Sequence, residues 1–209
     1  MKLTIFGATG RTGRYLVERA VAAGHDVTVL VRHPAKLSLQ NARLNVMQRN
    51  LTDALQVAQA VSGAEAVISV LGPAGNAPVF EISQGMHNIV AAMQQQGVRR
   101  LVVSAGAGVG DPNDAPKIFN RAMNVLLKLA AGNVYEDMRR TVALVRASGL
   151  DWTVVRVPML TDDPPTGAVQ VGYVGKGMGA RLSRADMAEF MLKQAADKTY
   201  LCQAPAISN

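Results

Sequence analysis

Three glycines near the start of the chain have the spacing of a phosphate-binding loop. An apolar segment, Leu3 to Phe6, leads directly into Gly7, Gly10 and Gly13, and a run of residues with helical spacing follows. Gly7 permits a tight turn, Gly10 lets the backbone approach a pyrophosphate, and Gly13 lets the helix pack close to the strand. Free N–H groups and the positive end of the helix dipole then face the phosphates. The strand-turn-helix context favours a dinucleotide site over an ordinary structural turn.

The residue that ends the second expected strand bears on which dinucleotide binds. Arg32 follows the strand 27–31, at the position where a site that prefers NAD usually has an acidic residue for the ribose 2′-hydroxyl. A guanidinium there would stack on the adenine and pair with a 2′-phosphate, which a carboxylate would repel. Arg11 and Lys36 add positive charge nearby. We therefore expect NADP rather than NAD; the alternative is that all three are solvated surface charges.

The composition is typical of one globular domain. With 209 residues, 49% of them hydrophobic and 18% charged, the chain can bury a full core. The net charge of +7 suits a polyphosphate ligand, and the basic residues are too scattered to predict a nucleic-acid partner. Cys202 has no second cysteine to pair with. Without a signal peptide or an apolar stretch of the roughly 18 residues that span a bilayer, we expect a cytoplasmic protein with no membrane contact.

Strands and helices alternate through the rest of the chain. After the first two strands, we expect strands at 43–48, 65–71, 100–104 and 152–157, an edge strand at 168–174 and a last strand near Leu201. The expected later helices are a short one ending at 61, then 80–96, 116–131, 134–148 and 184–196. This alternation predicts an α/β fold with a doubly wound parallel sheet of the Rossmann type. Residues 1–209 would form a single domain, with 157–182 as a small substrate-side lobe.

Local signals mark two helix starts and one close contact. Thr52 or Asp53 is expected to cap a helix. Ser183 resembles the cap of the last helix, with Asp186 reaching back as in a capping box. Gly85 lies inside a helix, where glycine costs about 1 kcal/mol against alanine, so we expect close packing to explain it.

Five segments together carry a family resemblance. They are Gly7–Gly13, Val29–Arg32, Asn88–Met93, Ser148–Leu150 and Leu182–Leu192. In this order they resemble an atypical short-chain dehydrogenase/reductase of the NAD(P)H-binding NmrA-like group, most closely the biliverdin-IXβ reductase/flavin reductase type. The resemblance spans nearly the whole chain, and the ordered set is more specific than the glycine motif alone.

The resemblance implies a cofactor site. The phosphate contacts would be Gly7, Thr9, Gly10, Arg11, Thr12 and Gly13. The 2′-phosphate would meet Arg32 and Lys36, and the adenine would lie beside Asn50 and Leu51. The ribose and nicotinamide side would be lined by Leu71, Gly72, Val103, Ser104 and Ala105. Apart from the resemblance, we expect Met123, Pro158 and Met159 on the substrate side, because methionines can form an adaptable apolar wall for a flat substrate; the alternative is that they fill the core.

The chain departs from the family at the positions that handle protons. Ala105 and Met159 stand where the flavin reductase has a serine and a histidine. Tyr135 is followed four residues later by Arg139, so the Tyr-x-x-x-Lys pair of ordinary short-chain dehydrogenases is missing. Ser104 is the candidate catalytic residue, as a hydrogen-bond donor to a carbonyl or a flavin; a structural hydrogen bond is the equal alternative.

The other titratable residues predict no further site. The histidines fall at a turn, a strand end and a helix, apart from other ligands; they are His25, His33 and His87. Four aspartates lie in loops, where aspartate favours turns; they are Asp111, Asp114, Asp162 and Asp163. We therefore expect no metal.

Three functions are compatible with these residues. The first is an NADPH-dependent reductase that transfers hydride to a planar conjugated acceptor, a flavin, quinone or tetrapyrrole, because the protein need mainly hold the two rings face to face. The second is a non-catalytic NADP(H) sensor, which the missing proton-handling residues suggest. The third, a relative of sugar-nucleotide epimerases, is disfavoured by the absent Tyr-Lys pair. For the first, the partner is a small molecule and the protein a monomer or weak homodimer.

Overall fold

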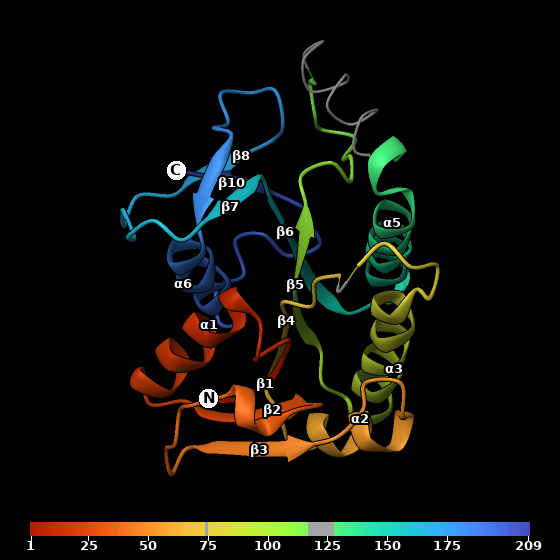
Figure 1. Ribbon diagram of the computed structural model, residues 1–209, viewed down its shortest axis with the longest axis vertical. Helices are drawn as coiled ribbons and strands as arrows, with labels where there is room; N and C mark the ends of the chain where they lie inside the picture. Colours follow the sequence, from red (N-terminus) through yellow and green to blue (C-terminus); the bar gives the residue numbers. More distant parts are fainter. Residues whose placement is uncertain (74, 117–127) are drawn as a thin grey trace.

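A mostly parallel sheet forms the centre of the molecule, with helices on both faces (Figure 1). The computed structural model describes residues 1–73, 75–116 and 128–209. The strands of this sheet are β1 (Lys2–Phe6), β2 (Asp26–Val31), β3 (Leu44–Gln48), β4 (Ala66–Ser69), β5 (Arg100–Gly106), β6 (Asp151–Val157), β8 (Gln170–Gly172) and β10 (Ala206–Ser208). The helices are α1 (Arg11–Ala22), α2 (Ala54–Val61), α3 (Glu81–Gln96), α5 (Gly132–Ala147) and α6 (Arg184–Gln194), with a 3₁₀ turn, η1 (Pro34–Lys36).

The strand order confirms the doubly wound sheet. It runs β3-β2-β1-β4-β5-β6-β10-β8, with β8 antiparallel to β10 and the other pairs parallel. The chain winds outward from β1 in one direction to β3 and then in the other direction from β4. The order therefore reverses between β1 and β4, and in such sheets a crevice opens at the carboxyl ends of these two strands.

Two cores hold the layers together. Helices α1 and α6 pack on one face of the sheet, and α2, α3 and α5 cover the other (Figure 1). Because successive side chains of a strand point to opposite faces, Leu3 and Ile5 join the core with α1 while Phe6 joins the core with α3. Buried on both sides, the strands read as nearly continuous apolar runs. No helix of the described residues is long and apolar enough to cross a membrane.

The segment 157–182 lies beside the carboxyl edge. Strand β7 (Met159–Thr161) pairs in parallel with β9 (Arg181–Ser183) in a separate small sheet, and β8 adds the antiparallel edge to the main sheet. The expected edge strand at 168–174 is therefore present, in a shorter form.

A buried ion pair joins this segment to the main sheet. Arg156 of β6 is 0% exposed and donates from both terminal nitrogens to Asp114, at 2.7 and 2.8 Å. The same carboxylate accepts the backbone N–H groups of Asp111 and Val174. One carboxylate thus holds together three segments: the loop after β5, strand β6 and the loop after β8.

Three expectations about elements need correction or fall outside the described residues. The segment near Leu201 is a turn, with Cys202 at φ 54°, and the last strand is β10. Ser183 caps α6 by accepting from Ala185 N–H, but Asp186 does not reach back to it; its carboxylate accepts from Thr166 and Gly167 instead. Most of the expected helix 116–131 lies outside the described residues.

Candidate functional site

A crevice of about 910 Å³ lies at the carboxyl edge of the sheet. Its walls come from the carboxyl ends of the strands β1, β2, β5 and β6, from the loops that follow β1, β2, β3, β4 and β6, and from the starts of α1, α3, α5 and α6. Most of the expected site residues line it: Gly7, Thr9, Gly10, Arg11, Thr12, Gly13, Arg32, Asn50, Leu51, Leu71, Gly72, Ser104, Ala105 and Pro158. The fold thus gathers into one place residues from distant parts of the chain.

The glycine loop has the backbone that a phosphate cradle requires. Gly7 has φ +87°, and a Cβ there would lie 2.7 Å from the carbonyl oxygen of Val70. A Cβ on Gly13 would collide with the carbonyl oxygen of Gly7, so only glycine lets α1 start this close to β1. Gly10 is the N-cap of α1 and has no side chain to cap the first N–H groups. These donors at the positive end of the helix fit a pyrophosphate.

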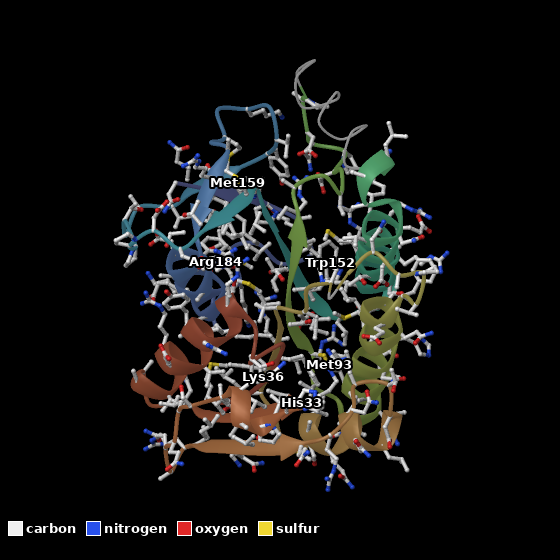
Figure 2. The ribbon with its side chains drawn as sticks, in the orientation of Figure 1. His33, Lys36, Met93, Trp152, Met159 and Arg184 are labelled. Atoms are coloured by element: carbon white, nitrogen blue, oxygen red, sulfur yellow. The ribbon has the colours of Figure 1, made fainter. Side chains whose placement is uncertain are left out.

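The cationic residues expected at the adenosine end separate into two groups. Arg32 lines the crevice, with its side chain 62% exposed and Nη1 3.8 Å from the carboxylate of Glu81. Lys36 is exposed on η1 and does not line the crevice (Figure 2). Arg32 is therefore the cation that faces the crevice at this end.

Gly85 and Leu51 form a close contact beside the adenine end. A Cβ on Gly85 would collide with the Leu51 side chain, which confirms that close packing explains this helical glycine. Asn88, one turn further along α3, donates its side-chain N–H to the Leu51 carbonyl at 3.0 Å. The loop that carries Leu51 is held against α3 by both contacts. Asp53 then caps α2 by accepting from the N–H groups of Leu55 and Gln56.

The alternation of strand residues decides which expected residues face the substrate side. Ser104 lines the crevice, whereas Val103 points into the core and is buried. Pro158 and Leu160 line it, whereas Met159, labelled in Figure 2, is 57% exposed and is not a lining residue. Met123 lies outside the described residues.

Side-chain hydrogen bonds join the first turns of α3 and α5, which the sequence analysis missed. Asp137 of α5 accepts the N–H groups of Ile82 and Ser83 in the first turn of α3. Asn76, in the loop before α3, accepts the N–H of Val134 in the first turn of α5. The helical spacing of Val134, Asp137 and Met138 could have indicated that these side chains share a face. All three line the crevice, and Asp137 is fully engaged as a cap.

Met138 faces the end of β5. Its sulfur accepts the backbone N–H of Gly106 at 2.8 Å, two residues beyond Ser104. Tyr135, by contrast, does not line the crevice, and the ammonium of Lys128 lies over its ring at 4.8 Å. The α5 side chain that contacts the end of β5 beside Ser104 is therefore the apolar Met138.

Arg184 is a second residue of the crevice that the sequence analysis missed. It is the first residue of α6, lines the crevice and has a side chain only 9% exposed. Its Nη1 lies 2.7 Å from Oδ1 of Asp162, whose other oxygen lies 3.2 Å from Nη1 of Arg11. One carboxylate thus bridges two arginines from the starts of α1 and α6.

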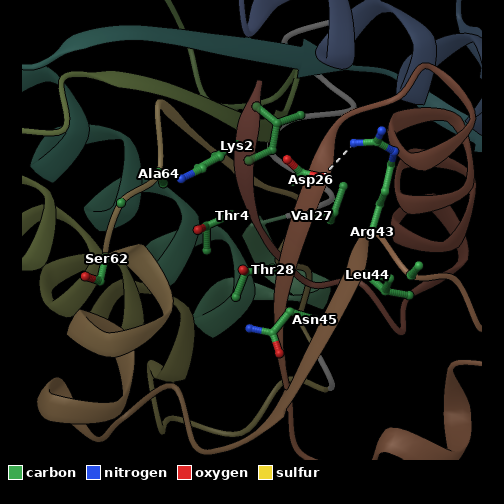
Figure 3. Close-up of a pocket in the computed structure, with 13 residues that line it drawn as sticks. Lys2, Thr4, Asp26, Val27, Thr28, Arg43, Leu44, Asn45, Ser62 and Ala64 are labelled. Atoms are coloured by element: carbon green, nitrogen blue, oxygen red, sulfur yellow. Dashed lines mark hydrogen bonds and ion pairs between the residues drawn. The ribbon is translucent and has the colours of Figure 1, made fainter.

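A separate cavity of about 450 Å³ lies at the amino edge of the sheet (Figure 3). Thr4, Thr28 and Asn45 form a polar row in register across β1, β2 and β3, and Arg43 pairs with Asp26 at 2.8 Å at the rim. Because its lining comes from the first halves of these strands, it lies at the edge opposite the glycine loop. It is not part of the crevice.

Comparison with known proteins gives this geometry a family. The profile of a family described as NAD(P)H-binding matches residues 7–198. Oxidoreductase aflX of Aspergillus parasiticus is 27% identical over 162 residues, which cover 70% of this chain and 59% of that protein. An uncharacterized chloroplastic protein of Arabidopsis thaliana is 29% identical over 185 residues, which cover 80% of this chain and 62% of that protein. The chain spans less than two thirds of the length of these relatives.

Solved structures share the fold along the whole chain. A short-chain dehydrogenase/reductase from Veillonella parvula, in complex with NADP, superposes with a TM-score of 0.83 at 21% identity, covering 100% of this chain and 94% of that one. ChuY of Escherichia coli O157:H7, described as an anaerobillin reductase, gives 0.79 at 21% identity, covering 100% and 97%. With its glycine loop at the reversal of the strand order and a family match over most of its length, the chain belongs to the NAD(P)H-binding family.

Proposed function

We propose that the protein is an NADPH-dependent reductase that transfers hydride to a planar conjugated acceptor, a flavin, quinone or tetrapyrrole. The observation that carries the proposal is one crevice that joins a phosphate cradle to an apolar compartment. Beside Ser104, the crevice is lined by Ala105, Met138, Pro158, Leu160 and Met187. Such walls suit a flat apolar ring, and a few polar groups suffice to orient it.

The residues of the chain bind the cofactor and the acceptor and orient the two rings. When bound, the nicotinamide supplies the hydride, which is the chemistry of the cofactor itself. The first turn of α1 holds the phosphates, and the apolar walls keep the acceptor ring against the nicotinamide. Ser104 donates a hydrogen bond to the acceptor atom that gains electron density. In this role it is the catalytic residue.

Protons reach the acceptor from solvent. Among the described lining residues there is no histidine, cysteine, tyrosine or lysine, and Asp137 already accepts two backbone N–H groups. Acceptors that take hydride without a positioned acid, such as oxidised flavins and quinones, are therefore the best substrates. An acceptor that depends on a protein acid is a poor one.

Parallel assays with three acceptors test the proposal. NADPH consumption is followed with FMN, a quinone and a biliverdin, with Gly10→Val as the control that does not bind cofactor. Turnover with at least one acceptor is expected, at a higher rate with NADPH than with NADH. Failure to bind either nicotinamide cofactor would rule the proposal out.

The second candidate function is a non-catalytic NADP(H) sensor. It is favoured by the same lining, which among the described residues has no histidine, cysteine, tyrosine or lysine, and whose carboxylates Glu81 and Asp137 face Arg32 and two backbone N–H groups. Tight NADPH binding with no turnover of any acceptor would select it. A sensor would also bind NADPH and NADP⁺ with different affinities, which a calorimetric titration with both forms measures.

A further inference from the structure

Arg184 presents a buried positive charge to the crevice. Arg184 lines the crevice, yet 9% exposure leaves its side chain little contact with water. The neighbouring lining residues Leu160 and Met187 are apolar, and Arg184 lies at the top of α6, below the segment that carries Met159 (Figure 2). A buried guanidinium needs an anionic partner, because the desolvated charge is otherwise costly.

The partner that the chain provides is exposed and exchangeable. The Asp162 side chain is 56% exposed and belongs to the turn Asp162–Pro165 between β7 and β8. The guanidinium of this pair is buried, while its carboxylate stays largely in water. Asp162 also contacts Arg11, in the glycine loop, so its carboxylate lies between the phosphate cradle and the substrate side.

A guanidinium binds carboxylate and phosphate oxygens with the same geometry. We infer that Arg184 is the anion-recognising residue of the crevice, and that Asp162 is an internal carboxylate which a ligand phosphate or carboxylate replaces. The oxyanion has two possible sources, a substituent of the acceptor or the pyrophosphate of the cofactor. The assignment of these sources rests on the proposed function; the anion site itself does not.

Titration with inorganic pyrophosphate tests the site directly. Asp162→Asn removes the competing carboxylate and is expected to tighten pyrophosphate binding several-fold. Arg184→Met is expected to weaken it by roughly tenfold or more, with partial recovery in Arg184→Lys. Asp163→Asn is the matched control, because its side chain makes no ion pair with the described residues; Arg14→Met is a charge control on α1, outside the crevice.

Two further measurements distinguish the sources. FMN and riboflavin differ only by a phosphate, so a rise in the KM for FMN but not for riboflavin in Arg184→Met assigns the site to the acceptor. Weaker NADPH binding with an unchanged FMN-to-riboflavin ratio assigns it to the cofactor. Thermal unfolding of each variant verifies that it is folded.

Equal pyrophosphate affinity in folded Arg184→Met and the unaltered protein overturns the inference. The pyrophosphate titration contains neither a nicotinamide nor an acceptor. A protein without reductase activity that still loses pyrophosphate binding in Arg184→Met would therefore contradict the proposed function and support the anion site.

Discussion

Arg32 is the side chain on which we expect the choice between NADPH and NADH to depend. Arg32 lines the crevice, and the carboxylate of Glu81 lies 3.8 Å away as its counter-ion. Arg32→Ala should weaken NADPH binding about ten- to a hundredfold, since a charge-assisted hydrogen bond is worth roughly 1.5–3 kcal/mol. NADH binding should change much less. Calorimetric titration measures both, with Lys36→Ala as the control; equal affinity of the unaltered protein for the two cofactors contradicts the prediction.

Adjacent residues of β7 provide a matched pair for the substrate side. Leu160 lines the crevice and Met159 points away from it. Leu160→His should place a group that titrates near neutral pH beside the acceptor, and so add a new ionisation to the pH profile of kcat/KM. Met159→His should leave the profile unchanged. A new ionisation in Met159→His alone would show that the register of β7 is wrong.

Individual site residues were predictable where backbone chemistry selects the residue type. The glycines of the first loop could be identified because a tight turn and close packing demand them. Arg32 lines the crevice because it directly follows β2, and its role at a 2′-phosphate stays a prediction. Arg184 and Asp137 could not be identified in this way, because their partners are distant in the sequence. Arg184 pairs with a residue 22 positions away, and Asp137 accepts from residues 54 and 55 positions away. Met159 was misplaced because the resemblance gives the position along β7 but not the face that each residue takes.

The start of α1 makes two separate demands on its glycines. A Cβ on Gly13 collides with the backbone of Gly7, whereas a Cβ on Gly10 lies 3.2 Å from the Gly7 carbonyl oxygen and meets no other part of the structure closely. Gly13→Ala should therefore lower the free energy of unfolding, by about 1–3 kcal/mol or more. Gly10→Val should abolish NADPH binding while the protein stays folded. Thermal unfolding and calorimetry separate the two; a folded Gly10→Val that binds NADPH normally contradicts the assignment of the loop.

Long periodic elements were predicted well, and elements determined by distant contacts were not. The strands β1, β2 and β5 and the helix α3 follow from their apolar patterns. The capping box at Ser183 failed because Asp186 finds donors in the Thr166–Gly167 turn, 20 residues away. Strand β10 was missed because it is only three residues long and is fixed by its pairing with β6 and β8, which are distant in the sequence.

At the scale of the whole molecule, the arginines that contribute to the net charge of +7 are unevenly distributed between the core and the crevice. Arg100 and Arg156 are buried structural cations: Arg100 donates to the carbonyl oxygens of Gln194 and Asp151, and Arg156 to Asp114. Arg11, Arg32 and Arg184 face the crevice. Composition alone could indicate an anionic ligand, but the fold determines which arginines meet it.

The buried pair of Arg156 and Asp114 makes the stability of the whole fold depend on pH. Burial raises the pKa of Asp114, but hydrogen bonds from Arg156 and from the N–H groups of Asp111 and Val174 outweigh it, so the pKa lies below its usual value. The carboxylate therefore stabilises the fold above the pKa of an unfolded aspartate. This contribution is lost as the pH falls through the lower pKa of the folded state.

Asp114→Asn should lower the free energy of unfolding at pH 7 by about 3–5 kcal/mol, because it leaves the fully buried Arg156 without its counter-ion. The matched control is Asp151→Asn, whose partner Arg99 is exposed, so the loss there should be below about 1 kcal/mol. Urea unfolding between pH 7 and pH 3 measures both variants. The free energies of unfolding of Asp114→Asn and of the unaltered protein should become more similar as the pH falls and Asp114 becomes protonated. If their difference is independent of pH, or no larger than that of the control variant, this ion pair does not hold the segment 157–182 to the sheet.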